Sequence, residues 1–177
     1  KMMAELCDKP LVNMESATSH PCQALADWYT MDELRVPERG KFVLTWANHP
    51  RALPLAVPAS TVHMAAMRGM DVVVLRPEEY ALPEPIMEKA RQAAKASGGS
   101  VYETSDRAEA LKGAHVIYAK EWGSPKFYGD HEAEARLREY LSDWCVKESW
   151  FKNADPDCRF MHCLPVRRNV AVADEVL

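Results

Sequence analysis

The sequence predicts an α/β fold with a doubly wound parallel sheet, in which helices cover both faces. The first indication is that short apolar segments alternate with longer segments whose apolar residues recur at helical spacing. The second is that the short segments, such as Val72 to Leu75, lack the polar–apolar alternation of a half-exposed strand. The third is an ordinary globular composition, with 47% hydrophobic and 27% charged residues. Strands that are apolar throughout are typical of a parallel sheet buried on both sides.

Residues 1–39 precede this alternation and have an organisation of their own. The short apolar run 11–14 is a candidate strand, and Pro21 suits the first position of a helix. That helix continues at helical spacing through Cys22, Leu25, Ala26 and Tyr29. A proline and a glycine in 35–40 then predict a linker. We therefore expect one domain to end here and a second to span 40–177.

Beyond the linker the expected elements alternate regularly. The expected strands are 42–46, 72–75, 101–103, 116–119 and 160–162. The expected helices are 58–68, 85–97, 108–111 and 132–141. Gly98 and Gly99 follow the second of these helices and are typical of a helix end. Residues 171–177 look like the start of another helix, and together with Lys1 in the first position they lead us to expect part of a longer chain.

Composition and charge exclude several classes of protein. A net charge of −4, without a cluster of Lys and Arg, argues against nucleic acid as a partner. No apolar run approaches the roughly 20 residues that span a membrane, and the first residues carry charges where a secretory signal is apolar. Five cysteines without metal-ligand spacing fit reduced thiols, so we expect no metal site. These features together predict a cytoplasmic protein.

The carboxyl ends of the expected strands are the predicted ligand site, because a doubly wound sheet binds its ligand where the strand order reverses. Polar and reactive side chains concentrate in 46–50, 120–122 and 163–168, after the first, fourth and fifth strands. No G-x-G-x-x-G follows the first strand, and the chain has no Walker-type G-x-x-x-x-G-K. The sheet is therefore expected to hold a ligand other than a dinucleotide or a nucleoside triphosphate.

The string His20-Pro21-Cys22-Gln23 sets an imidazole and a carboxamide about one turn apart at the start of the first helix. Both side chains can then face one small polar group near the positive end of the helix. Imidazole can donate a hydrogen bond to a carbonyl oxygen, and the Gln23 carbonyl can accept one from an NH2 group. The alternative for this string alone is a helix cap followed by a surface glutamine.

A second string, His162-Cys163-Leu164 followed by proline, comes directly after the last expected strand. It sets a thiol and a backbone carbonyl at the strand end. Arg167 and Arg168 follow, and guanidinium groups suit carboxylate or phosphate. The alternative is a buried cysteine that ends a strand, with the arginines on a solvated face.

Together the two strings, one on each side of the expected domain boundary, make the chain resemble the aspartate/ornithine carbamoyltransferase family. Members carry His-Pro-x-Gln in the carbamoyl phosphate domain, and the ornithine branch carries His-Cys-Leu-Pro in the amino-acid domain. The resemblance covers nearly all of the chain and includes Tyr118 to Gly123 after the fourth strand. It implies that 1–39 is the C-terminal part of a carbamoyl phosphate-binding α/β domain. Residues 40–177 would be an amino-acid-binding domain truncated at its C-terminus.

The resemblance implies transfer of a carbamoyl group from carbamoyl phosphate to an amine, without a metal or an organic cofactor. It places His20 at the carbamoyl oxygen, where negative charge develops, and it places Gln23 and the Leu164 carbonyl at the carbamoyl NH2. Cys163 would lie beside the incoming amine as a positioning group and not as a covalent nucleophile. The predicted carbamoyl phosphate-binding residues are His20, Pro21, Cys22, Gln23, Cys163 and Leu164, of which His20, Gln23 and Cys163 are the predicted catalytic residues.

The acceptor is predicted from charge. Ornithine enzymes have an aspartate after the fourth strand that pairs with the α-ammonium of the substrate, whereas this chain has Lys120 there. A lysine repels an α-ammonium, but it attracts the α-carboxylate of an acylated ornithine. Such a charged hydrogen bond contributes on the order of 1–3 kcal/mol. This lysine and the His49-Pro50 loop resemble the N-acetylornithine branch. The predicted acceptor-binding residues are Glu15, Lys120, Leu164 and Arg167.

The chain also departs from the family pattern. The Ser-x-Arg-Thr-Arg phosphate loop is absent, and Ala171 stands where acetylornithine enzymes carry a carboxylated lysine. The resemblance further implies a homotrimer that acts in arginine biosynthesis, while the 177 residues alone are expected to have little activity. The resemblance does not decide whether the acyl group on the acceptor is acetyl or succinyl. Two alternatives also stay open: an ornithine carbamoyltransferase, and a relative that binds carbamoyl phosphate without transferring it.

Overall fold

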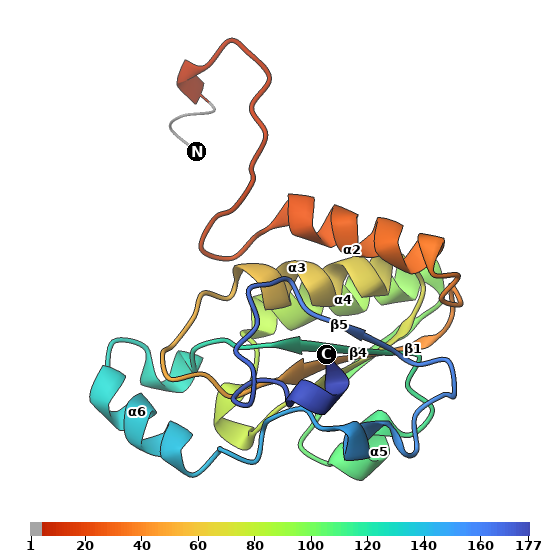
Figure 1. Cartoon of the computed structure of the whole chain (residues 1–177). Coiled ribbons are helices and arrows are strands. Elements are labelled where there is room, and N and C mark those ends of the chain that lie inside the picture. The colour runs from red at the N-terminus through yellow and green to blue at the C-terminus, as the bar shows by residue number, and fades with distance from the viewer. Residues whose placement is uncertain (1–4) are drawn as a thin grey trace.

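A five-stranded parallel sheet forms the centre of the protein in a computed structural model that describes residues 5–177 (Figure 1). The strands are β1 (Lys41–Trp46), β2 (Asp71–Leu75), β3 (Ser100–Thr104), β4 (Val116–Lys120) and β5 (Arg159–Met161). Their order is β3-β2-β1-β4-β5, and all neighbours pair in parallel. Because the order reverses between β1 and β4, the predicted doubly wound sheet is confirmed.

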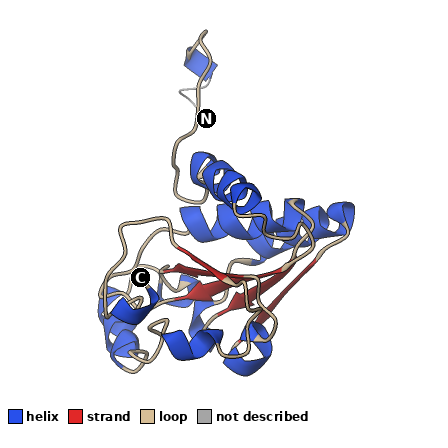
Figure 2. Ribbon diagram, turned by 45° about the vertical axis from the view of Figure 1, so that its right-hand side comes forward, coloured by secondary structure: helices blue, strands red, loops and turns tan. Residues whose placement is uncertain are grey.

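Helices lie on both faces of this sheet, as the apolar strands predict (Figure 2). They are α2 (Pro21–Glu33), α3 (Ala56–Met67), α4 (Glu84–Ser97), α5 (Arg107–Leu111) and α6 (His131–Glu139). In Figure 1, α2, α3 and α4 lie on one face, α5 lies on the other, and α6 lies toward the carboxyl ends of the strands. Short 3-10 turns span Glu78–Tyr80, Pro125–Phe127, Glu148–Phe151 and Asp174–Val176. None of the helices within residues 5–177 has the length and apolar character needed to cross a membrane.

Two of the expected elements are wrong. Residues 11–14 form no strand, and Leu11, Val12 and Met14 are 54–70% exposed. A strand needs a partner to satisfy its backbone, and Figure 1 shows this segment projecting away from the sheet. At the other end, residues 171–177 contain the 3-10 turn Asp174–Val176 and a β-bridge at Val172 in place of the expected helix.

The junction between α4 and β3 is closed by two glycines. Gly98 has a φ of 85° and ends α4 in the left-handed conformation that glycine adopts most readily. A Cβ atom on Gly99 would lie 2.4 Å from the carbonyl oxygen of Met70, so only glycine fits there. The helix end predicted from this pair is therefore confirmed.

The helix α2 is attached to the sheet domain through α3. Its Met31 is fully buried in the same hydrophobic core as the sheet. At its N-terminal end the backbone N–H of His20 donates to Oγ of Ser60 at 2.7 Å. At its C-terminal end Arg68 of the α3 C-cap donates to Oδ1 of Asp32 at 2.9 Å. The structure thus ties the end of the predicted first domain to the second, and a boundary near residue 39 stays a prediction.

Candidate active site

A cavity of about 240 Å³ opens at the carboxyl ends of the strands and gathers most of the predicted site residues. Lys120, the last residue of β4, pairs with Trp46, the last residue of β1, so the cavity adjoins the reversal of strand order. The residues that line it are Glu15, His20, Gln23, Leu53, Pro54, Val57, Lys120, Cys163 and Leu164. Two strings about 140 residues apart in sequence therefore meet in one place, as the sequence predicts.

His20 and Gln23 are oriented by the start of α2. His20 is the N-cap residue, and its Nδ1 accepts the backbone N–H of Gln23 at 3.4 Å. The side-chain Nε2 of Gln23 donates to Oδ1 of Asp27 at 2.8 Å, one turn further along the helix. Asp27 is 5% exposed, and burial raises the pKa of its carboxyl group. Because the amide nitrogen of Gln23 is used in this way, its carbonyl oxygen stays free to accept a hydrogen bond in the cavity.

Lys120 brings a buried positive charge to the cavity. The residue is 8% exposed, and its Nζ donates to Oε2 of Glu121 at 3.1 Å. Burial opposes the charged form of Glu121, but the neighbouring His162 and the charge of Lys120 outweigh burial and lower the pKa of this carboxyl to about 2. An ammonium group has three donors and this contact uses one of them, so Lys120 retains donors for an anionic ligand.

The loop after β5 supplies the thiol and the carbonyl. Burial raises the pKa of the Cys163 thiol, so the neutral form dominates near pH 7. A neutral thiol agrees with the predicted role of Cys163 as a positioning group. Leu164 has a φ of 46°, and its backbone N–H donates to Nδ1 of His162 at 2.9 Å.

Three predicted site residues lie outside this cavity. Cys22 is exposed, with Sγ 3.8 Å from the carbonyl oxygen of Asn13. Arg167 donates from Nε to Nε2 of His49 at 2.9 Å and so joins the loops that follow β5 and β1. Pro21 lines a different cavity.

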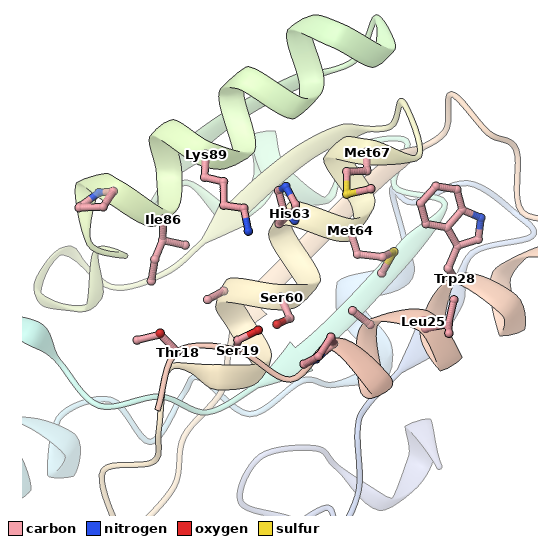
Figure 3. A pocket seen from close by; sticks show the side chains of 14 residues that line it. Thr18, Ser19, Leu25, Trp28, Ser60, His63, Met64, Met67, Ile86 and Lys89 are labelled. Carbon is pink, nitrogen blue, oxygen red and sulfur yellow. The ribbon is translucent and has the colours of Figure 1, made fainter. Parts of the chain in front are cut away.

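That second cavity is larger, about 650 Å³, and lies between α2, α3 and α4 (Figure 3). Its lining is mostly apolar and includes Trp28 and Met64, while His63 and Lys89 approach from the α3 and α4 side (Figure 3). Its lining includes none of His20, Gln23 and Cys163. Across residues 5–177 there is also no group of three or more His, Cys, Asp or Glu side chains placed to hold a metal ion. The smaller cavity is therefore the candidate active site.

A buried ion pair on α6 holds the loops beside the site, and it is not among the predicted site residues. Arg138 donates to the carbonyl oxygen of His49 at 2.9 Å and to that of Trp122 at 3.0 Å. It also donates to Oε1 of Glu134 at 2.7 Å, and the same oxygen accepts the backbone N–H of Ser124 at 2.9 Å. The available signal was the i,i+4 spacing of Glu134 and Arg138. From sequence alone, this spacing predicts an ordinary ion pair on the helix surface. The structure shows that both side chains are buried.

The strand order and the cavity at its reversal define a doubly wound α/β protein that binds a ligand at the carboxyl ends of its strands. The comparison with known families identifies which one. Residues 56–177 match the family model of the aspartate/ornithine carbamoyltransferase Asp/Orn binding domain, and the chain belongs to this family. Among its relatives is the N-acetylornithine carbamoyltransferase of Xanthomonas campestris pv. campestris. The two are 40% identical over 181 residues, which is 100% of this chain and 53% of that protein.

Two further similarities follow the same pattern. The N-succinylornithine carbamoyltransferase of Bacteroides thetaiotaomicron is 36% identical, over 96% of this chain and 48% of that protein. A crystal structure of acetylornithine transcarbamylase complexed with acetylcitrulline superposes with a TM-score of 0.92 at 40% identity, over 98% of this chain and 52% of that one. The chain thus spans about half the length of the curated relatives it matches.

Proposed function

We propose that the protein containing this chain transfers the carbamoyl group of carbamoyl phosphate to the side-chain amine of an N-acylated ornithine, with N-acetylornithine as the preferred acceptor. The products are the N-acylcitrulline and phosphate. The observation that carries the proposal is that Lys120 lines the same cavity as His20, Gln23 and Cys163. One cavity then offers neutral polar groups for the carbamoyl group and a cation for a carboxylate.

The neutral amine attacks the carbonyl carbon, so a carbon–nitrogen bond forms and the carbon–oxygen bond to phosphate breaks. The proton that the amine loses ends on the leaving phosphate. Negative charge develops on the carbamoyl oxygen during the attack. His20 can donate to this oxygen from Nε2, because its Nδ1 is occupied as an acceptor from the backbone N–H of Gln23. The free carbonyl of Gln23 and the backbone carbonyl of Leu164 accept from the carbamoyl NH2.

The proposed acceptor follows from the charge of the groups in the cavity. Lys120 attracts the α-carboxylate, and an acyl group removes the positive charge that the α-amine of ornithine would otherwise bring beside it. Glu15 lines the cavity and is proposed to contact the acylated amine. Arg167 lies just outside, held by His49, and is proposed to approach the carboxylate when the acceptor binds.

The test compares N-acetylornithine, N-succinylornithine and ornithine as acceptors for the intact protein, with carbamoyl phosphate saturating and the carbamoylated product measured. We expect kcat/KM for an N-acylornithine to exceed that for ornithine by tenfold or more, on the order of the energy of one charged hydrogen bond. A clear preference for ornithine would overturn the acceptor assignment. Binding of carbamoyl phosphate without transfer to any of the three would show the non-catalytic relative.

We also propose that the intact protein is a cytoplasmic homotrimer that acts in arginine biosynthesis. The five cysteines, all within the described residues, form no disulfide, which fits a reducing compartment. The names of the relatives, N-acetylornithine and N-succinylornithine carbamoyltransferases, fit an amino-acid biosynthetic role. Sedimentation of the intact protein at three times the mass of one chain is the expected result, and the mass of a monomer or dimer would refute the trimer.

A further inference from the structure

Glu121 and His162 form a buried pair that the proposed mechanism does not use. Both side chains are 3% exposed. The Oε2 atom of Glu121 lies 3.1 Å from Nζ of Lys120 and 3.5 Å from Nε2 of His162. One carboxylate oxygen therefore faces both the lysine of the acceptor site and the imidazole that precedes Cys163 and Leu164.

The other ring nitrogen of His162 holds the loop after β5. Nδ1 accepts the backbone N–H of Leu164 at 2.9 Å, so Nδ1 carries no proton. The proton of the neutral ring is then on Nε2, which faces Glu121. Nδ1 is thereby bonded to the backbone of the site, while Nε2 faces the carboxylate at 3.5 Å without a hydrogen bond.

The backbone of Leu164 requires such a contact. Its φ of 46° lies in the left-handed region, which residues with a side chain rarely adopt. The side chain contributes little packing to hold that conformation, because the residue is 67% exposed. The hydrogen bond to His162 holds the residue at its amide side and so restricts the backbone that carries the carbonyl group.

We propose that Glu121 and His162 are positioning residues that hold Lys120 and the Leu164 carbonyl in a fixed mutual arrangement. Glu121 orients the lysine directly and the loop through the imidazole. The acceptor's carboxylate and the carbamoyl NH2 are then bound by groups that share one buried carboxylate as their support. This inference rests on the proposed carbamoyl transfer, and neither residue touches the reacting atoms.

The test uses the intact protein with three conservative variants. His162→Asn keeps an acceptor at the position of Nδ1 for the Leu164 amide, whereas His162→Gln keeps a polar group only at the position of Nε2, toward Glu121. Glu121→Gln keeps the shape and removes the charge beside Lys120. His131→Asn and Glu132→Gln make the same chemical changes at exposed positions on α6 and serve as matched controls. The measurements are kcat and the KM of each substrate, with unfolding midpoints recorded for every variant.

We expect His162→Gln to lower kcat about tenfold, on the order of one lost hydrogen bond, and His162→Asn to recover most of that loss. Glu121→Gln is expected to raise the KM for the N-acylornithine about tenfold, through the loss of orientation at Lys120. A merely structural role shifts the unfolding midpoints and leaves kcat and KM at the control values, and that result overturns the inference. Equal kcat for the Asn and Gln variants also overturns it. Absence of transfer by the wild-type protein refutes the proposed function instead, so the two failures are distinct.

Discussion

Replacing Arg138 by methionine is expected to cause a large loss of stability. The guanidinium group is 5% exposed and donates to the carbonyl oxygens of His49 and Trp122 as well as to the carboxylate of Glu134. It thereby fastens the loops after β1 and β4, the two strands between which the order reverses. The methionine keeps most of the apolar volume of the side chain and removes all of these donors.

The magnitude follows from what the substitution leaves behind. The Glu134 side chain is 4% exposed, and breaking a buried ion pair from one side costs about 3–5 kcal/mol. The carbonyl of His49 also loses its donor, at about 1–3 kcal/mol for a buried group left unsatisfied, whereas the carbonyl of Trp122 keeps a hydrogen bond from Nε1 of Trp46 at 3.0 Å. Groups that share one guanidinium are not additive. We therefore take the ion pair alone as the lower bound and expect the free energy of unfolding to fall by at least about 3 kcal/mol.

The assay is urea unfolding of the intact protein, followed by tryptophan fluorescence. Arg136→Met is the matched control, because Arg136 is 68% exposed and lies 3.9 Å from Glu132 on the same helix, where about 0.5 kcal/mol or less is expected. The double variant Arg138→Met/Glu134→Met removes both charges and should be more stable than the single variant by about 1 kcal/mol or more. An Arg138→Met protein as stable as the control, or a double variant less stable than the single one, would refute the reasoning.

Three further predictions concern the candidate site. His20→Ala is expected to lower turnover by about 10²-fold or more, because one donor to a developing oxyanion contributes a factor of that size; unchanged product formation would remove His20 from the site. Lys120→Met is expected to raise the KM for N-acetylornithine at least about tenfold while the KM for carbamoyl phosphate changes little, with the exposed Lys152→Met as control; a KM equal to that of the control would contradict the charge argument. The pKa of Glu121 falls from its ordinary value of 4.5 to about 2 on folding, so its contribution to stability is fully present above pH 4.5 and is lost as the pH falls from 4.5 toward 2. Urea unfolding between pH 5 and pH 3 should show this loss in the wild-type protein and a shallower one in Glu121→Gln, and parallel curves would exclude it.

Sequence reasoning predicts the strands and helices closely because their signals are local. The Val72 to Leu75 run is apolar throughout, and its strand begins only one residue earlier, at Asp71. Sequence patterns do not predict a strand correctly where the strand depends on a neighbouring strand for its backbone hydrogen bonds. Residues 11–14 have the composition of a strand, but within the described chain they have no neighbouring strand to pair with.

The site shows the same division. His20, Gln23, Lys120, Cys163 and Leu164 are found from motif and strand end, and the structure brings them to one cavity. Their supports are not found in this way, because Asp27, Glu121, His162 and Arg138 act through tertiary burial that composition does not reveal. A carboxylate next to a lysine in the sequence reads as a solvated pair. Only the fold shows that the Glu121 side chain is buried and faces an imidazole from the loop after β5.

The double attachment of α2 to α3 has a mechanical consequence. One end of α2 is held at Ser60 and the other at Arg68, and Met31 is sunk in the core between them. Because both ends of α2 are held against α3, the helix cannot pivot about either end. His20 and Gln23 are therefore fixed relative to the sheet that carries Lys120 and the loop that carries Cys163. The groups proposed to meet the carbamoyl unit and the acceptor therefore lie on one packed unit.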